Sequence, residues 1–498
     1  MGSIKSILSL NFARYIVRKN NRWKNNAIEY QNKIMHSLVN NAKNTLFGKD
    51  HFFQKISTYE DFKKNIPIRD YEGLKNYILL IKDGEKNILW PGKPIYFCKT
   101  SGTTSGTKFI PLTKESISCH LNPARDAILS YINETKNTSI VDGKMIFLQG
   151  SPKLDKTSGI LTGRLSGIVA HHIPFYLKKN RLPSFKNNCI EKWEEKVDAI
   201  VDETIEKDMS LISGIPPWVQ MYFEKLSLKS GRLIKELFPN FKLFIYGGVN
   251  YEPYRKTFKR LIGSDIDSVE VYPASEGFIA YQDSQKENGM LLCVNNGIFY
   301  EFIKRDDFFK QNPQRINLSK VVVGVDYVII LYTNAGLWGY NLGDTVKFVS
   351  INPYRIIVSG RLKHFTSAFG EHVISQEVEE SLNNTISVIS AEIKEFHVAP
   401  NISPEKGLPS HQWFIEFSKE PEDMSLFEQN LDRELQKKNS YYKDLIKGSV
   451  LKQLEIIKIK ESGFNEYMSS IGKLGGQNKT PRLSNDRSIA DKLILYKK

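Results

Sequence analysis

The sequence predicts an α/β protein with two domains: a large N-terminal domain with mostly parallel sheets and a β-barrel-like part, and a smaller α+β C-terminal domain. From about residue 90, short β-rich runs alternate with helical stretches, a pattern typical of parallel sheets. Between residues 298 and 358 the runs follow one another with little helix between them, as in a barrel or an antiparallel sheet. A chain of 498 residues also exceeds what one ordinary hydrophobic core accommodates.

Each domain has its own predicted order of elements. Residues 20–85 carry apolar side chains at helical spacing. A fresh α+β pattern starts after SGRLKHF, with helices predicted over 375–386 and 425–438 and strands around them. We therefore predict a boundary near residue 362, separating a domain 1–362 from a smaller mobile domain 363–498.

Composition narrows the class of protein. The hydrophobic content of 41% is that of a globular chain, and no run approaches the roughly 20 apolar residues of a membrane-spanning helix. The net charge of +15 is spread along the chain without a nucleic-acid-binding signature. Four cysteines without C-x-x-C spacing fit a reducing compartment. We predict a cytoplasmic protein that binds neither nucleic acid nor membrane.

The N-terminal segment allows two interpretations. Lys5, Arg14, Arg18 and Lys19 stand beside apolar residues and could form a basic amphipathic helix on a membrane. The alternative is a helix that docks on the rest of the protein and leaves a solvated basic face. We predict the docked helix.

A loop rich in hydroxyl groups follows the β-rich run that ends at Cys98. Gly102 and Gly106 allow backbone N–H groups to turn inward, while further donors and a positive charge come from Ser101, Thr103, Thr104 and Lys108. Such a loop can wrap a triphosphate, although a polar hairpin has a similar composition. It is not a Walker A loop, because that spacing is absent and a strand follows.

Two further motifs lie at predicted strand ends. In Val271-Tyr-Pro-Ala-Ser-Glu-Gly, Tyr272 can stack on a base and Glu276 can hold a magnesium ion. Upstream, Gly247 permits close backbone approach to a flat ligand. In the Gly-Asp step before the strand TVKFV, Asp344 can accept both hydroxyls of a ribose. Each carboxylate could equally be a solvated turn residue.

The last motifs lie at the predicted boundary and near the C-terminus. Arg361 and Lys363 belong to Ser359-Gly-Arg-Leu-Lys-His. The Gly-rich stretch Gly475-Gly-Gln-Asn-Lys-Thr-Pro-Arg presents Lys479 and Arg482.

In this order and spacing the motifs resemble those of the adenylate-forming superfamily. Within it, the chain is most similar to the Gretchen Hagen family of acyl acid amido synthetases, which is known from auxin-responsive plant proteins, and to its bacterial branch. The resemblance runs from about residue 90 to the C-terminus. It is carried by stretches such as GSPKLDKTSGILTGRLSGIVAHHIPFY, YPASEGFIAYQD, TNAGLWGYNLGDTVKF, GRLKHFTSAFGEHV and GGQNKTPRLSNDR.

The resemblance implies an adenylate-forming fold and a role for each motif. Glu276, Asp344 and Lys479 would be catalytic, and Glu276 would also hold Mg²⁺. The ATP-binding set would be Ser101, Thr103, Thr104, Lys108, Gly247, Tyr272, Ser275, Glu276, Asp344, Arg361 and Lys363. Gly339 departs from the family pattern, because relatives usually carry Arg there, so we expect a charged contact near the nucleotide to be missing.

The implied function is the ATP-dependent activation of a small carboxylic acid as its acyl-adenylate, with release of pyrophosphate and transfer of the acyl group to an amine, most naturally an amino acid. Two alternatives stay open: transfer to a thiol such as coenzyme A, and a non-catalytic nucleotide-binding homologue. Segments that could line the acyl pocket contain His171, His172, Tyr176 and Trp218. Each of these is also common as a packed core or strand residue.

Overall fold

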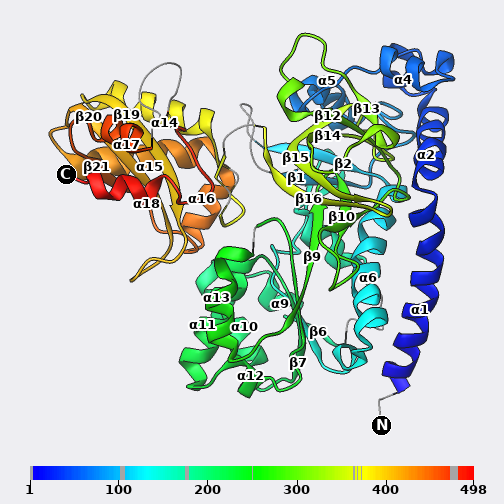
Figure 1. The fold of residues 1–498 in the computed structure, drawn as a ribbon, viewed down its shortest axis with the longest axis horizontal. Coiled ribbons are helices and arrows are strands. Elements are labelled where there is room, and N and C mark those ends of the chain that lie inside the picture. Colours follow the sequence, from blue (N-terminus) through cyan, green and yellow to red (C-terminus); the bar gives the residue numbers. More distant parts are fainter. Residues whose placement is uncertain are drawn as a thin grey trace. The chain divides into compact units, whose positions relative to one another are not determined.

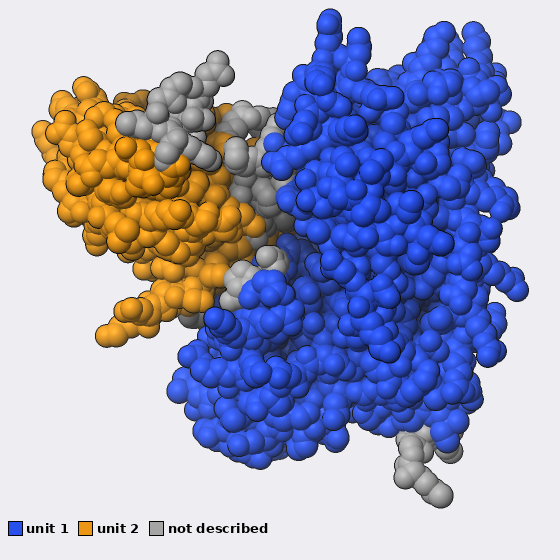
Figure 2. Space-filling model, viewed as in Figure 1, with its two compact units in different colours: residues 1–100, 109–189, 197–362 blue, residues 101–108, 190–196, 363–498 orange. Residues whose placement is uncertain are grey.

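The computed structural model describes the chain in two compact units (Figures 1 and 2). The residues that it describes are all except 1–3, 101–106, 174–178, 250, 363–364, 367, 372 and 472–479. Unit 1 comprises residues 1–100, 109–189 and 197–362, and unit 2 comprises residues 101–108, 190–196 and 363–498.

The chain begins with helices, as the apolar spacing predicts. They are α1 (Ile4–Asn25), α2 (Ala27–Ala42), α3 (Leu46–Asp50), α4 (Tyr59–Asn65) and α5 (Tyr71–Lys82). Local sequence fixes where they start: Thr58 and Asp61 form a capping box on α4, and the Asp70 carboxylate caps α5. The long helix α6 (Lys114–Thr135) packs against α1.

One sheet of twelve strands runs through unit 1. Its parallel half consists of β3 (Lys144–Phe147), β6 (Arg181–Leu182), β7 (Met209–Ser213), β8 (Leu243–Tyr246) and β9 (Asp267–Ala274). Parallel strands need crossover connections, which here contain α10 (Trp193–Thr204), α11 (Pro216–Ser230), α12 (Ile234–Leu237) and α13 (Arg255–Ile262). Every residue of β8 is buried, as expected for a strand covered on both faces.

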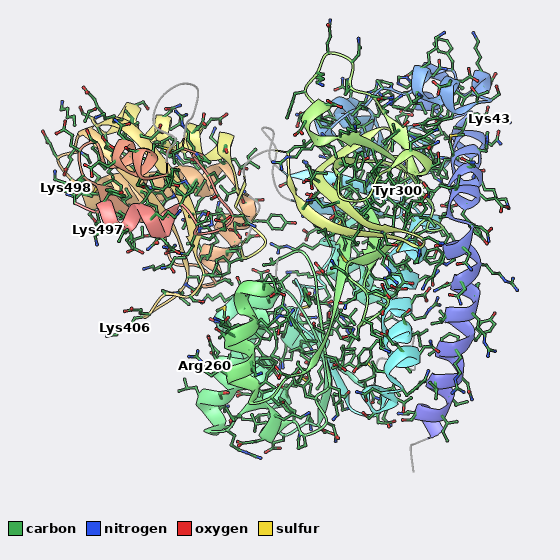
Figure 3. All side chains as sticks on the ribbon, viewed as in Figure 1. Lys43, Arg260, Tyr300, Lys406, Lys497 and Lys498 are labelled. Atoms are coloured by element: carbon green, nitrogen blue, oxygen red, sulfur yellow. The ribbon has the colours of Figure 1, made fainter. Side chains whose placement is uncertain are left out.

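The other half of this sheet is antiparallel, which confirms the prediction for residues 298–358. It consists of β10 (Gly277–Tyr281), β11 (Met290–Leu292), β12 (Ile298–Lys304), β13 (Ile316–Asn317), β14 (Asp326–Thr333), β15 (Tyr340–Ile351) and β16 (Tyr354–Arg361). The core here is aromatic, and Tyr300 lies inside it (Figure 3), where its backbone N–H donates to the Gln31 side chain of α2 at 2.9 Å.

Strand β15 begins earlier than the sequence predicts. We expected a strand over TVKFVS, but the extended backbone starts at Tyr340. The reason is a contact with the segment before α5: the Arg69 N–H donates to the Gly339 carbonyl at 2.7 Å, and the Asn341 N–H donates to the Arg69 carbonyl at 2.6 Å. Asp344 therefore lies within a strand and not at its entry.

A smaller sheet of unit 1 carries the strands on either side of the hydroxyl-rich loop. It contains β1 (Tyr96–Thr100), β2 (Lys108–Leu112), β4 (Asp155–Thr157) and β5 (Ile160–Gly163). Beside β1 lies α7 (Leu165–His171), and α9 (Phe185–Asn188) follows later in the chain.

Unit 2 is an α+β module, as predicted. Its three-stranded sheet has β20 (Ser410–Lys419) in the centre, antiparallel to β19 (Glu392–Asn401) and parallel to β21 (Glu455–Ile459). A short hairpin pairs β17 (Phe365–Thr366) with β18 (Val373–Ile374). The helices are α14 (Ser375–Val388), α15 (Met424–Lys438), α16 (Ser440–Lys447), α17 (Gly463–Ser470) and α18 (Ala490–Leu493). In the part of the chain that the structure describes, no helix is long and apolar enough to cross a membrane.

Candidate active site

Two side-chain contacts join the β9–β10 hairpin to strand β15. The Tyr272 hydroxyl donates to Asp344 Oδ2 at 2.5 Å, and both side chains are buried. The Tyr340 hydroxyl is hydrogen-bonded to the Glu276 carboxylate. Strands β10, β11 and β16 lie between β9 and β15 in the sheet, which in a flat sheet would separate them by about 19 Å. The ends of these strands must therefore curve toward each other.

Glu276 lies in a tight turn next to the end of β1. Ala274 pairs with Gly277, so Ser275 and Glu276 form a two-residue connection between β9 and β10. The Cys98 thiol of β1 donates to Ser275 Oγ at 3.1 Å. Burial raises the pKa of the Cys98 thiol to about 12, which keeps it protonated and able to donate. The end of β1, from which the hydroxyl-rich loop follows in the sequence, therefore lies beside the Ser-Glu turn.

The loop itself is described only at its edges. Strand β1 ends at Thr100 and β2 begins at Lys108, so the predicted arrangement of a strand on each side of the loop is present. Ser101, Thr103 and Thr104 lie outside the described residues.

Gly247 lies where a side chain has no room. It follows β8, and a Cβ atom built on it would lie 2.2 Å from the carbonyl oxygen of Val271. Val271 directly precedes Tyr272, so the backbone after β8 runs against the strand that carries the tyrosine. The glycine therefore brings these two backbones closer than any other residue would allow.

Asp344 is held beside the end of unit 1. It pairs with Arg361 in the β15–β16 ladder, and the Leu362 N–H donates to the Gly343 carbonyl at 2.9 Å. Of the other residues predicted near the boundary, the side chain of Arg361 and the whole of Lys363 lie outside the described residues, as does Lys479.

The structure explains why residue 339 is glycine. Gly339 has a positive φ of 60°, and a Cβ atom built on it would lie 2.3 Å from the Pro67 carbonyl oxygen. The backbone contact with residues 67–69 thus excludes an arginine at this position. The same contact places Tyr340, the partner of Glu276, at the start of β15.

The acyl-pocket candidates that the structure describes lie on α7 and α11. His171 and His172 lie at the C-terminal end of α7 and not on a strand. The Nε2 atom of His171 is 2.7 Å from the Pro152 carbonyl oxygen, and that of His172 is 3.0 Å from the Tyr96 hydroxyl. Burial lowers the pKa of His172, with a smaller contribution from His171. Trp218 lies in α11, and Tyr176 lies outside the described residues.

Two residues of this site were not predicted from the sequence. The sequence predicts that Cys98 is an apolar strand residue and that Tyr340 belongs to the loop before TVKFVS. Their partners, Ser275 and Glu276, are distant in sequence, so no local spacing relates the members of each pair. Predicting β15 from residue 340 would have placed the tyrosine on a strand, but not against Glu276.

The residues around Glu276 fit a magnesium ion bound together with a nucleotide. Mg²⁺ is commonly held by one or two carboxylates and the substrate phosphates. Glu276 is one buried carboxylate, oriented by Tyr340. Among the described residues there is no group of three His, Cys, Asp or Glu side chains that would form a metal cage by itself. This arrangement suits a metal that arrives with phosphates.

The fold is that of the adenylate-forming enzymes. The structure matches that of the acyl acid amido synthetase GH3.15 in complex with 2,4-DB, with a TM-score of 0.62 and 15% identity over 97% of this chain and 96% of the other. It also matches a 2-hydroxyisobutyryl-CoA ligase bound to its acyl-adenylate and CoA, with a TM-score of 0.59 and 13% identity over 95% and 92% of the two chains.

The chain belongs to the GH3 family. The model of the GH3 family N-terminal domain matches residues 17–189, that of the central domain matches residues 291–361, and that of the C-terminal domain matches residues 376–488. A jasmonoyl–L-amino acid synthetase of Nicotiana attenuata is 25% identical over 57% of this chain and 60% of its own. An indole-3-acetic acid-amido synthetase of Arabidopsis thaliana is 22% identical over 64% of both chains. This chain therefore spans less than two thirds of the length of these curated relatives.

Proposed function

We propose that the protein is an ATP-dependent acyl acid amido synthetase that activates a small carboxylic acid as its acyl-adenylate and transfers the acyl group to an amino acid. The observation that carries this proposal is the meeting of Tyr272, Glu276 and Asp344 beside the end of β1, in a chain of the GH3 family. The names of its relatives support an amide-forming reaction.

In this proposal ATP is bound and oriented by residues around the β9–β10 turn, by β15 and by the hydroxyl-rich loop. Asp344 accepts hydrogen bonds from the two ribose hydroxyls, and Tyr272 packs near the adenine. Gly247 allows the ligand to approach the backbone. Ser275 contacts the nucleotide beside Glu276. The phosphates are bound by Ser101, Thr103, Thr104 and Lys108.

Glu276 holds Mg²⁺ in this proposal, and the ion, when bound, neutralises phosphate charge so that a carboxylate can approach the α-phosphorus. No side-chain nucleophile is needed, because the substrate carboxylate itself attacks. What the chain supplies is alignment of the two reactants and a set of positive charges around them.

Unit 2 contributes Lys479, and Arg361 and Lys363 lie at the hinge on which unit 2 moves. The end of the lysine segment is fixed: Thr480 is buried, and the backbone of Val398 in β19 hydrogen-bonds to Arg482 and Ser484 at 2.9 Å each. Closure of such a unit would also exclude water from a hydrolysable adenylate.

We place the protein in the cytoplasm, where its four free cysteines would stay reduced. The acceptor amine must be neutral to attack, so conjugation should accelerate as the pH rises toward the pKa of the amine.

The test measures the exchange of labelled pyrophosphate into ATP in the presence of each member of a panel of carboxylic acids. Each amino acid is then added to the reaction that contains the carboxylic acid supporting exchange. We expect AMP and pyrophosphate as products and an N-acyl amino acid in the mass spectrum. ADP as the main product would rule out adenylation. Thioester formation with coenzyme A, and no product with any amino acid, would identify a thiol ligase instead.

A further inference from the structure

Helix α1 is docked on unit 1 by one of its faces. Ala13, Ile16 and Trp23 are buried in the core of unit 1, and α1 packs against α6. Polar contacts fix both ends of this face. The Ser6 hydroxyl donates to Asp142 Oδ2 at 2.6 Å, and the Asn20 amide donates to Asp126 Oδ2 at 2.9 Å. The predicted docked helix is therefore present.

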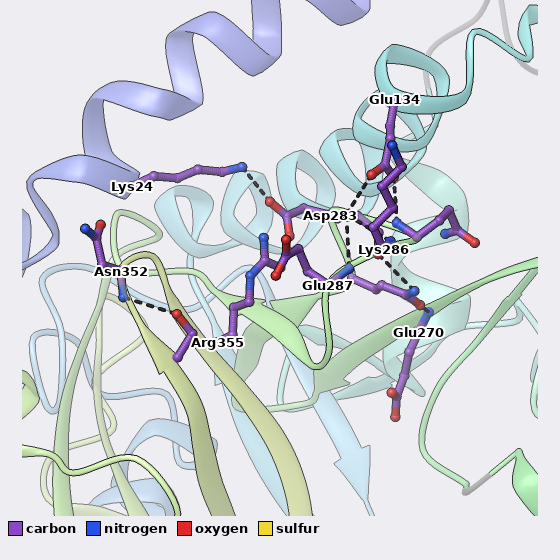
Figure 4. A network of polar contacts seen from close by, with 12 residues as sticks. Lys24, Glu134, Glu270, Asp283, Lys286, Glu287, Asn352 and Arg355 are labelled. Carbon is purple, nitrogen blue, oxygen red and sulfur yellow. Dashed lines mark hydrogen bonds and ion pairs between the residues drawn. The ribbon is translucent and has the colours of Figure 1, made fainter.

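A salt-bridge network holds the C-terminal end of α1. Lys24 Nζ lies 2.5 Å from Asp283 Oδ2, and Arg355 pairs with the other oxygen of the same carboxylate (Figure 4). All three side chains are largely buried, so the network binds α1 to the β10–β11 connection and to β16. A helix anchored along its length presents its opposite face to the outside as a rigid surface.

The opposite face of α1 is not a purely polar surface. Large apolar side chains project from its first half: the exposed fractions are 59% for Ile7, 63% for Leu8, 44% for Phe12 and 61% for Tyr15. Leu8, Phe12 and Tyr15 follow one another at helical spacing and so lie on one side. Figure 1 shows α1 at the edge of unit 1, with α6 on one side of it only.

Positive charges accompany these apolar side chains. Helix α1 contains no Asp or Glu at all, and its exposed cations are Lys5, Arg14, Arg18, Lys19 and Arg22. On the next helix, the exposed Glu29 is already paired with Lys33. The exposed face of α1 thus combines apolar side chains with positive charge that no carboxylate of its own helix offsets.

We propose that the exposed face of α1 docks the protein on an anionic phospholipid surface. An interfacial helix inserts Leu, Phe and Tyr side chains at the level of the headgroups while Lys and Arg contact acidic lipids. The sequence alone led us to predict a solvated basic face, because it did not reveal that Leu8, Phe12 and Tyr15 would be on the outside. The proposal is independent of the chemistry assigned to the nucleotide site.

Charge also selects between this partner and two others. A second copy of the chain would bring two cationic faces together, which costs electrostatic energy. Nucleic acid would satisfy the cations but would leave the four apolar side chains without a partner. An anionic bilayer matches both features of the face.

The experiment is flotation of the full chain with phosphatidylcholine vesicles, with and without phosphatidylserine. We expect the protein to float only with the phosphatidylserine vesicles and to be released at high salt, because screening weakens the electrostatic part of binding. Absence of flotation, or equal flotation with both vesicles, would overturn the proposal.

Matched variants test whether α1 is the docking face. Arg18→Glu/Lys19→Glu should lower vesicle partitioning at least about tenfold, whereas the same change in net charge on α13, Lys256→Glu/Arg260→Glu, should leave most of it (Figure 3 shows Arg260 on α13). Similarly, Leu8→Asp should lower vesicle partitioning, and Leu228→Asp on α11, which makes the same substitution where the side chain is 86% exposed, should not.

Each variant is checked for an unchanged melting temperature, since all the substituted side chains are on the surface. Equal loss of binding in the α1 and control variants would show that the vesicles attract the protein through its overall positive charge. That result would overturn the assignment of the docking face to α1. A concentration-dependent dimer that the α1 variants abolish would show that a second copy covers this face, and would overturn it as well.

Discussion

The Tyr272 hydroxyl and the Asp344 carboxylate are 2.5 Å apart, although their strands are separated by three others in the sheet. Four residues further along the hairpin, Glu276 meets Tyr340, which lies four residues before Asp344 on β15. The two contacts cross-link the same two segments and hold both carboxylates in one place. A nucleotide bound there would meet a preorganised pair of acidic groups.

The first prediction concerns the ribose contact. Asp344→Asn should weaken ATP binding by about 1.5–3 kcal/mol, because it replaces charged hydrogen bonds with neutral ones. Tyr272→Phe should weaken ATP binding less than about tenfold, since it removes only the group that orients the carboxylate. Calorimetric titration with ATP measures both changes. Unchanged affinity in the Asp344 variant would disprove the ribose contact.

The second prediction concerns magnesium. Glu276→Gln should raise the Mg²⁺ concentration needed for half-maximal pyrophosphate exchange, and Tyr340→Phe should raise it to a smaller extent. Burial keeps the pKa of Tyr340 well above its ordinary value, so the effect of Tyr340→Phe should be the same at pH 7 and pH 9.

The control for this prediction is Glu252→Gln, which removes an exposed carboxylate that pairs with Arg255. Its Mg²⁺ requirement should equal that of the unmodified protein. A similar shift in all three variants would mean that the effect is general and that Glu276 does not hold the ion.

The third prediction concerns Gly339. Gly339→Ala should destabilise unit 1 by more than about 2 kcal/mol, since it combines left-handed backbone strain with a clash against the Pro67 carbonyl. Gly343→Ala is the matched control, because Gly343 also has a positive φ, of 86°, but has no atom within 4 Å of its Cβ position. Urea denaturation compares the two, and equal losses would show that the Pro67 contact is unimportant.

The fourth prediction concerns the anchor of the C-terminal segment. The Nδ1 atom of the buried His397 lies 2.6 Å from the Pro481 carbonyl oxygen, so the neutral ring donates there. The pKa of His397 is lowered to about 4, mainly by burial and in smaller part by Arg487, against the opposing effects of the Pro481 hydrogen bond and Asp486.

Folding therefore has to keep His397 neutral, and the resulting stability is lost as the pH falls from 6.5 to 4. His397→Asn removes this titration. The quantity to follow is the free energy of unfolding of the unmodified protein minus that of the His397→Asn variant. This difference should fall by up to about 3 kcal/mol as the pH is lowered across this range. The difference must be used, because the pKa of Glu377 is raised to about 7 and this group titrates in the opposite sense. A difference that does not change with pH would contradict the assignment.

The fifth prediction concerns Lys479. Lys479→Ala should slow pyrophosphate exchange at least about tenfold without weakening ATP binding, if the lysine acts only when unit 2 closes. Lys473→Ala, in the same segment, is the control and should retain activity. Hydrogen exchange of residues 472–479 should slow on addition of ATP and the acid, and unchanged exchange would argue against closure.

The sequence by itself determined much of the fold. Apolar spacing predicted the N-terminal helices, and the β-rich runs around Leu243–Tyr246 and Asp326–Thr333 predicted strands. Both are local patterns, because the period of the backbone determines which neighbouring side chains share a face. The same holds for the turn that contains Glu276, since turns have characteristic residues, whereas Asp344 lies within β15 and not at the predicted entry of a strand.

Only the tertiary structure decided which of these residues meet. The bond from Tyr272 to Asp344, the placement of Cys98 against Ser275 and the requirement for glycine at 339 all depend on contacts between segments distant in sequence. Likewise, the sequence predicts that α1 is a basic helix with scattered apolar residues. Only its packing on α6 decides which of those residues remain exposed. Such contacts arise from the curvature of the sheet and the packing of its layers, and neither is encoded in the spacing of neighbouring residues.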